Sequence, residues 1–255
     1  MGSEFHIDYS PICHLYAKQQ GTGTLYLAFR DIPQFLRSYL PQNQMRPLKA
    51  LDFGCGTGVS TRYLKSLNSL FKDGLEVDGT DINLDMLKLA LEADPKGTYG
   101  QIHQGHIPAP DDSYDLVFST FVLFEFATQD KMQKALEEIK RVMKRESIFI
   151  AVTGSPDTYN RKNQWVSLKV DFPQNDCLKS GDLGRVDFMI NEQIMTFQNY
   201  YWTEQDYQEA FQKAGLRLIK THCPRGYKEE EKRLSWQWKS EISVSPYYIF
   251  VLSHA

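Results

Sequence analysis

The sequence predicts an α/β fold in which helices cover both faces of a mostly parallel, doubly wound sheet. An apolar stretch from Leu51 enters a glycine-rich turn ending at Gly58, as strands do where they lead into a helix. Strand and helix patterns then alternate up to residue 153. The run Leu116-Val117-Phe118 is typical of a central strand buried on both faces. Such alternation favours parallel strands joined by right-handed crossovers.

The remaining strands are expected from short apolar runs bounded by polar or glycine-containing turns. These runs lie at 75–80, 101–104, 114–120, 147–153, 216–221 and 247–252. With the strand that begins at Leu51, they make seven candidate strands. The sheet therefore extends over most of the chain.

The helices are expected from apolar residues at helical spacing and from residues that cap helix ends. A short helix is predicted at 32–40, ended by a proline, and a longer one at 59–71. Asn83 is expected to cap a helix whose buried face carries Leu84, Leu87 and Leu91. Thr203 begins a capping-box pattern, and the helix that follows is expected to end at Gly215.

One domain spanning residues 6–255 is the expected organisation for a chain of 255 residues. Residues 1–5 resemble a cloning remnant and are left out of the fold. The irregular segment 6–46 is expected to be an N-terminal cap. The alternation of strands and helices breaks between 154 and 201, which predicts an insertion on the substrate side.

Composition narrows the class of partner. The formal net charge is -3, so the chain has no basic footprint for a phosphate backbone, and nucleic acid is disfavoured. No apolar run approaches the length of a membrane span. The four cysteines lack metal-ligand spacing, which favours reduced thiols and a cytoplasmic protein without a metal site.

The glycine-rich turn points to a nucleoside ligand. Its glycines are spaced Gly54-x-Gly56-x-Gly58, whereas a dinucleotide site typically has G-x-G-x-x-G. Asp52, before the turn, would repel a phosphate but suits an ammonium group. Asp81, at the end of the second strand, is placed to accept hydrogen bonds from a ribose diol. A nucleoside with an amino-acid tail satisfies both carboxylates.

Three motifs in order resemble the class I S-adenosyl-L-methionine-dependent methyltransferases. They are Leu-Asp-Phe-Gly-Cys-Gly-Thr-Gly at 51–58, Gly-Thr-Asp-Ile-Asn at 79–83 followed by Leu-Asp-Met-Leu, and Pro-Asp-Asp-Ser-Tyr-Asp-Leu-Val at 110–117. The resemblance covers residues 49–153 well. It implies a Rossmann-like seven-stranded sheet with an antiparallel last strand, and S-adenosyl-L-methionine as cofactor, released as S-adenosyl-L-homocysteine.

The resemblance also implies roles for individual residues. Asp81 is expected on the ribose hydroxyls and Ile82 against the adenine. His106 and Ile107 stand where the family usually has an acid and a small residue beside the adenine amino group, which is a departure from its pattern. The remaining candidate cofactor contacts surround the methionine portion and the methyl group, with Tyr16 added from the N-terminal cap: Tyr16, Asp52, Gly54, Cys55, Gly56, Ser119 and Thr120.

Absent motifs favour a small organic methyl acceptor. The segment after the fourth strand lacks the Asn/Asp-Pro-Pro-aromatic motif of exocyclic-amine nucleic-acid methyltransferases, the Pro-Cys nucleophile of cytosine C5 enzymes and the Mg²⁺ carboxylates of catechol-type enzymes. The acceptor wall is expected to include Phe124, Tyr200 and Tyr201.

No catalytic residue is assigned, because transfer from a sulfonium needs alignment more than a dedicated base. If a base is used, the candidates are His106, Glu125 and His222. Three alternatives stay open: transfer to RNA or a protein side chain, a non-catalytic binding module, and a nicotinamide oxidoreductase, which the glycine spacing disfavours.

Overall fold

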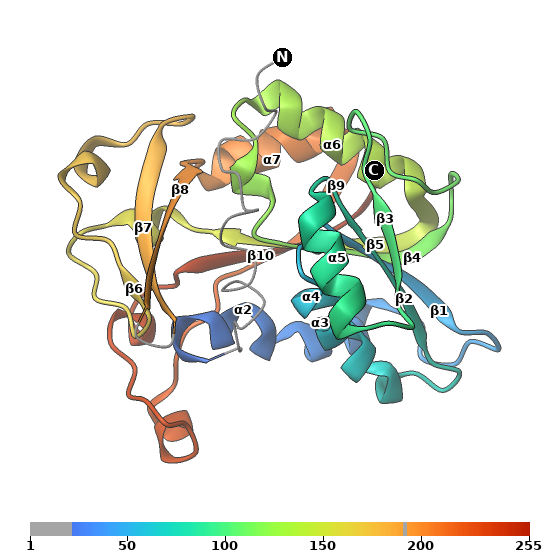
Figure 1. Ribbon diagram of the computed structural model, residues 1–255, viewed down its shortest axis with the longest axis horizontal. Coiled ribbons are helices and arrows are strands. Elements are labelled where there is room, and N and C mark those ends of the chain that lie inside the picture. The colour runs from blue at the N-terminus through green and yellow to red at the C-terminus, as the bar shows by residue number, and fades with distance from the viewer. Residues whose placement is uncertain (1–21, 191–192) are drawn as a thin grey trace.

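The computed structural model describes residues 22–190 and 193–255 and contains a seven-stranded sheet with the order β3-β2-β1-β4-β5-β10-β9 (Figure 1). Strand β10 is antiparallel to both of its neighbours, and the other strands run parallel to one another. This arrangement confirms the predicted fold class. The strands are β1 (Leu48–Phe53), β2 (Leu75–Asp81), β3 (Thr98–Gln101), β4 (Tyr114–Thr120), β5 (Met143–Gly154), β9 (Leu216–His222) and β10 (Tyr247–His254).

Helices cover both faces of the sheet. They are α2 (Tyr26–Arg30), α3 (Ile32–Tyr39), α4 (Val59–Ser66), α5 (Leu84–Ala93), α6 (Gln129–Val142) and α7 (Glu204–Lys213). Figure 1 shows α6 and α7 together on one side of the sheet and α2, α3 and α4 on the other. Thr203 forms the predicted capping box of α7 with Asp206, and Gly215 follows that helix with φ +71°.

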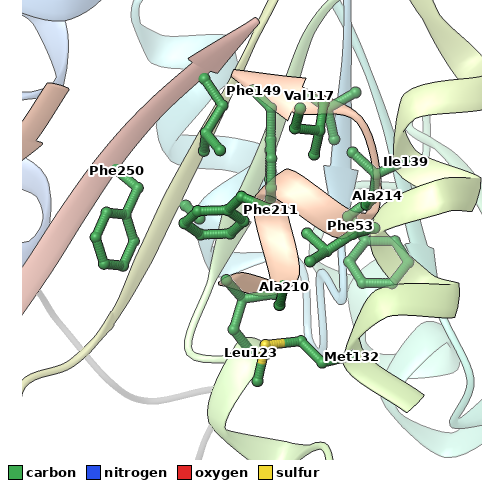
Figure 2. Packing of buried hydrophobic residues seen from close by; sticks show 14 of the residues in the cluster. Phe53, Val117, Leu123, Met132, Ile139, Phe149, Ala210, Phe211, Ala214 and Phe250 are labelled. Carbon is green, nitrogen blue, oxygen red and sulfur yellow. The ribbon is translucent and has the colours of Figure 1, made fainter. Parts of the chain in front are cut away.

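Side chains of successive residues in a strand point to opposite faces of the sheet, so the central strands contribute to two separate hydrophobic cores. In β4, Val117 joins the core beneath α6 and α7, whereas Leu116 and Phe118 join the core on the side of α3 and α4. Figure 2 shows the first core, where the rings of Phe211 and Phe250 meet edge to face with centroids 5.1 Å apart.

Two local expectations were wrong. The buried face of α5 carries Met86, Leu87 and Ala90, whereas Leu84 and Leu91 are exposed. Asn83 caps α5 as predicted, but the face turned to the sheet begins two residues later than expected. The third strand is Thr98–Gln101 rather than 101–104. Pairing with β2 determines the bounds of this strand. Gln104 lies beyond the paired residues and adopts φ +52°.

A second, three-stranded antiparallel sheet lies within residues 154–201, where no strand was predicted. Its strands are β6 (Leu168–Lys169), β7 (Leu183–Ile190) and β8 (Gln193–Tyr200), and Figure 1 shows them to one side of the main sheet. In β8, the side chains of Met195, Phe197 and Asn199 are buried and those between them are less so. This period of two was a readable strand signal.

Among the residues described, no helix is long and apolar enough to cross a membrane.

Candidate active site

A cavity of about 540 Å³ lies at the edge of the main sheet where the parallel strands end. The loops after β1, β2, β3 and β4 form one part of its wall, and the first turns of α6 form another. The carboxyl ends of parallel strands are where open α/β sheets bind ligands. Of the predicted site residues, the structure places seven along this cavity: Gly54, Cys55, Gly56, Asp81, Ile82, His106 and Thr120.

The glycine-rich turn folds tightly against the end of β2. The N–H groups of Gly54 and Cys55 both donate to the carbonyl oxygen of Thr80, at 2.7 and 2.9 Å. Gly54 has φ +73°, and a Cβ built on it would lie 2.3 Å from a methyl carbon of Val122, which follows β4. Glycine is therefore required at position 54 both for the backbone conformation and for the contact between the two loops.

Asp81 ties the glycine turn to the start of α5. Its Oδ2 accepts the N–H of Gly56 at 2.8 Å, and its Oδ1 accepts the N–H of Asn83 at 2.8 Å. Burial raises the pKa of Asp81, and hydrogen bonds from backbone N–H groups oppose that rise. The carboxylate has about four acceptor sites, so acceptor capacity remains beyond the backbone N–H groups of Asn83, Gly56 and Ile82.

Asp52 is fully buried and does not line the cavity. Its Oδ2 accepts hydrogen bonds from the hydroxyls of Ser60 at 2.7 Å and Thr61 at 2.6 Å, so the carboxylate holds the first turn of α4 to β1. Its Oδ1 has no hydrogen-bond partner among the described residues. Ser60 itself lines the cavity, so its hydroxyl links Asp52 to the cavity wall.

The burial of Asp52 makes the stability of the protein depend on pH. Burial raises the carboxyl pKa to about 6, so the folded protein keeps a proton there that the unfolded chain releases near pH 4. Ionisation above pH 6 therefore costs the folded state free energy, and stability rises by about 1 kcal/mol as the pH falls from 7 to 5. Asp52→Asn is expected to remove this rise, as measured by thermal unfolding between pH 5 and 8.

Asp73→Asn is the matched control, because it removes the same charge from an exposed position. It is expected to keep the pH dependence of the unmodified protein. An Asp52→Asn variant with that same dependence would contradict the assignment of the effect to Asp52.

Glu138 of α6 brings a carboxylate to His106 and Ile107 in the loop after β3. His106 lines the cavity, and its Nδ1 lies 3.1 Å from Oε2 of Glu138. The same oxygen accepts the N–H of Ile107 at 3.1 Å, and the Ile107 side chain is fully buried behind the cavity wall. Burial opposes ionisation of Glu138, but hydrogen bonds from Arg141 and Ile107 hold its pKa below the usual value. No motif in the sequence indicated Glu138.

The chain turns sharply where β4 ends. Thr120 lines the cavity, whereas Ser119 is buried and its hydroxyl has no partner within the described part of the chain. Phe121 adopts φ +61°, which is rare for a bulky residue, and its N–H donates to the carbonyl of Val152 at 2.8 Å. This backbone conformation places the Phe121 ring in the cavity wall, stacked on Phe124 with centroids 6.0 Å apart.

A smaller cavity of about 40 Å³ lies between the end of the main sheet and the second sheet. Leu25 and Phe121 line both cavities, so the two spaces adjoin. Phe124, which the sequence predicts in the acceptor wall, lines the smaller one. Most of its other lining residues are aromatic or aliphatic, and Phe197 and Asn199 reach it from β8.

Tyr200 and Tyr201 line neither cavity. Tyr200 packs against the core beneath α6 and α7, and the Tyr201 ring lies edge-on to Tyr159 with centroids 5.9 Å apart. Of the three candidate bases, Glu125 and His106 line the larger cavity. His222 does not line it, and its Nε2 lies 2.8 Å from Oδ2 of Asp31. Tyr16 lies outside the described residues.

Within residues 22–190 and 193–255, no three His, Cys, Asp or Glu side chains are grouped so as to hold a metal ion.

Comparison with known proteins agrees with this geometry. A model of the methyltransferase domain matches residues 51–151. N-demethylindolmycin N-methyltransferase of Streptomyces griseus is 25% identical over 185 residues, which are 68% of this chain and 72% of that protein. Malonyl-[acyl-carrier protein] O-methyltransferase of Halorhodospira halophila is 30% identical over 54% of this chain and 46% of its own length. The tRNA N(3)-cytidine methyltransferase METTL2 of Mus musculus is 26% identical over 67% of this chain and 41% of its own length.

Solved structures share the fold across nearly the whole chain. An S-adenosylmethionine-dependent methyltransferase from Clostridium acetobutylicum superimposes with a TM-score of 0.60 at 15% identity, covering 97% of this chain and 99% of that one. DesVI of Streptomyces venezuelae gives 0.59 at 18% identity, covering 98% and 100%. The fold, the strand-end cavity and the domain match define a methyltransferase. Residues 51–151 thus carry a methyltransferase domain, and the chain shares the fold of S-adenosylmethionine-dependent methyltransferases.

Proposed function

We propose that this protein transfers a methyl group from S-adenosyl-L-methionine to a small organic molecule, with the cofactor in the larger cavity and the acceptor entering from the side of the second sheet. The observation that carries the proposal is the junction of the two cavities at Phe121. The glycine turn and Asp81 lie on one side of it, and an aromatic wall lies on the other. Residues 22–255 would then act as one domain, with 154–201 as its substrate-side insertion.

The residues along the larger cavity fit the cofactor. Asp81 has acceptor capacity left for the ribose hydroxyls, and the exposed Ile82 beside it offers an apolar surface for the adenine. His106, supported by Glu138, would face the adenine amino group. Gly54, Cys55, Gly56 and Thr120 line the part of the cavity proposed for the methionine portion. The volume of about 540 Å³ is within the usual range for ligand sites.

Bound there, the cofactor would supply an activated methyl group: the bond from the sulfonium sulfur to the methyl carbon would break as the acceptor atom bonds to that carbon, and S-adenosyl-L-homocysteine would be the leaving group. The protein's task is then to align the acceptor and to exclude water. The stacked rings of Phe121 and Phe124 and the cover of the second sheet suit that task.

Several features support a small acceptor. The smaller cavity is lined mostly by aromatic and aliphatic side chains, and the chain carries a net charge of -3, which gives little attraction for RNA. Acceptors named among the relatives include both a small molecule and a tRNA. We further propose a cytoplasmic location, which agrees with the free thiols of Cys55, Cys177 and Cys223.

Two measurements test the proposal in sequence. Calorimetry with S-adenosyl-L-homocysteine is expected to show one binding site per chain. The protein is then given methyl-labelled S-adenosyl-L-methionine with separate low-mass, RNA and protein fractions of a cell extract. Label is expected in the low-mass fraction. Label in RNA or protein alone would overturn the small-acceptor proposal, and the absence of any cofactor binding would overturn the site.

A further inference from the structure

A buried tyrosine lines the smaller cavity from the segment that follows β5. Tyr159 ends the 3-10 helix Pro156–Tyr159, and only 4% of its surface is exposed. The N–H of Thr158 donates to the carbonyl of Ser155 at 3.0 Å, and the Thr158 hydroxyl donates to the carbonyl of Pro246. These bonds fix the short helix to the end of the main sheet, so the fold itself holds Tyr159 in place.

The second sheet holds the ring of this tyrosine. A Cβ built on Gly184 of β7 would lie 2.5 Å from Cδ1 of Tyr159, so the backbone of the strand packs closely against the ring. On another side the Tyr201 ring lies edge-on to it, with centroids 5.9 Å apart. Because the hydroxyl oxygen lies on the axis of the ring, the packing that fixes the ring also fixes the position of that oxygen.

The Tyr159 hydroxyl has no hydrogen-bond partner among the described residues. By contrast, Thr158 and Asn199 line the same cavity and are both bonded, Asn199 through its Nδ2 to Oε1 of Glu125 at 2.6 Å. Burial, with Tyr207 and Glu125 nearby, raises the pKa of Tyr159 well above its ordinary value, so the hydroxyl keeps its proton and can donate it. A buried polar group without a partner is uncommon and calls for one.

The cavity favours an uncharged oxygen as that partner. Most of the lining residues are aromatic or aliphatic, and no lysine or arginine lines the cavity within the part of the chain that the structure describes. An anionic oxygen would lose its hydration there without gaining a counter-charge. The volume of about 40 Å³ exceeds the roughly 10–15 Å³ that one water needs, so the cavity admits one small substituent rather than a whole acceptor.

From this geometry, and resting on the proposed function, we infer that Tyr159 is a specificity-determining residue whose hydroxyl donates a hydrogen bond to an uncharged, carbonyl-type oxygen of the methyl acceptor. That oxygen would enter the smaller cavity, and the atom to be methylated would lie toward the larger one, where the two spaces adjoin at Leu25 and Phe121. Loss of either the hydroxyl or the oxygen leaves its partner buried and unpaired, so this contact would discriminate between acceptors.

The test compares two probes of nearly the same shape, acetophenone and α-methylstyrene, in which a methylene group replaces the carbonyl oxygen. Each is titrated into the protein saturated with S-adenosyl-L-homocysteine and followed by ligand-observed NMR. The ratio of the two affinities is compared between variants, which cancels the greater hydrophobicity of the hydrocarbon. Tyr159→Phe is expected to shift this ratio about fivefold or more against acetophenone, the scale of an unpaired buried carbonyl.

Gly184→Ala is a second variant, which keeps the hydroxyl but displaces the ring that carries it. It is expected to shift the ratio in the same direction as Tyr159→Phe. The two variants differ in stability: Tyr159→Phe is expected to leave the midpoint of thermal unfolding unchanged or to raise it, because the hydroxyl that it removes has no partner in the protein.

Tyr114→Phe is the matched control. Tyr114 is similarly buried and lines neither cavity, and its hydroxyl donates to Oδ2 of Asp78 at 3.1 Å. This variant is expected to keep the ratio of the two affinities and to lower the unfolding midpoint, because it leaves a carboxylate oxygen without its donor.

Binding of S-adenosyl-L-homocysteine is measured for every variant, so that misfolding is recognised. With that binding intact, this inference alone would be overturned by an unmodified protein that does not bind acetophenone, by a ratio that Tyr159→Phe leaves unchanged, or by a loss of stability in Tyr159→Phe as large as in Tyr114→Phe. Absence of cofactor binding by the unmodified protein would instead overturn the proposed function.

Discussion

Gly54→Ala is expected to destabilise the fold by about 2–5 kcal/mol and to weaken binding of S-adenosyl-L-homocysteine at least tenfold. An alanine at φ +73° costs about 1–2 kcal/mol of backbone energy. Its methyl group would also lie 2.3 Å from the Val122 side chain, and relieving such overpacking costs a further 1–3 kcal/mol or so. Because Val122 and Gly54 both line the larger cavity, any shift of either loop also changes the shape of the proposed cofactor site.

Gly105→Ala separates the two contributions. Gly105 also has a positive φ, +79°, and lines the same cavity, but no atom lies within 4 Å of a Cβ built on it. This variant is expected to show the backbone cost alone, about 1–2 kcal/mol. Denaturant unfolding and calorimetry of both variants measure the difference. Equal losses in the two variants would contradict the role of the Val122 contact.

Asp81→Ala is expected to weaken binding of S-adenosyl-L-homocysteine by about 1–3 kcal/mol, or roughly 5- to 150-fold. The ribose hydroxyls would lose their acceptor, and the N–H groups of Gly56 and Asn83 would lose theirs, at 2.8 Å each. The substitution therefore acts on the ligand directly and also on the order of the glycine turn. Calorimetry measures the affinity, and thermal unfolding without ligand measures the effect on the turn.

Asp85→Ala is the matched control for Asp81. It removes a carboxylate four residues away, from an exposed position in the first turn of α5, where its partner is Lys88 at 2.8 Å. Its cofactor affinity is expected to equal that of the unmodified protein. If Asp81→Ala bound the cofactor as tightly as Asp85→Ala, Asp81 would be removed from the proposed site.

The contacts local to the glycine turn could be predicted from the sequence because they depend on residues next to one another along the chain. A strand, a glycine turn and a helix in succession bring Gly54 and Gly56 to the edge of the sheet, and the end of the neighbouring parallel strand brings Asp81 beside them. The same local logic predicted Asn83 and Thr203 as helix caps.

The direction of the Asp52 carboxylate could not be predicted in the same way. Its charge suggested an ammonium ligand, but the structure turns it to the hydroxyls of Ser60 and Thr61. Which way a strand residue faces depends on the helix packed behind it, and this is a tertiary property. The carboxylate beside His106 likewise could not be predicted, because it belongs to Glu138 of α6, which only tertiary packing brings to the loop after β3.

The sequence by itself determined the sheet, its glycine turn and the class of cofactor, because periodicity and turn chemistry act over a few residues. Only the tertiary structure decided which side chains line the smaller cavity. Phe197 and Asn199 line it and Tyr200 and Tyr201 do not, since the pairing of β7 with β8 fixes which alternate residues of β8 point inward. The bond between Asn199 and Glu125 joins segments far apart in the chain, and no local pattern specifies such a contact.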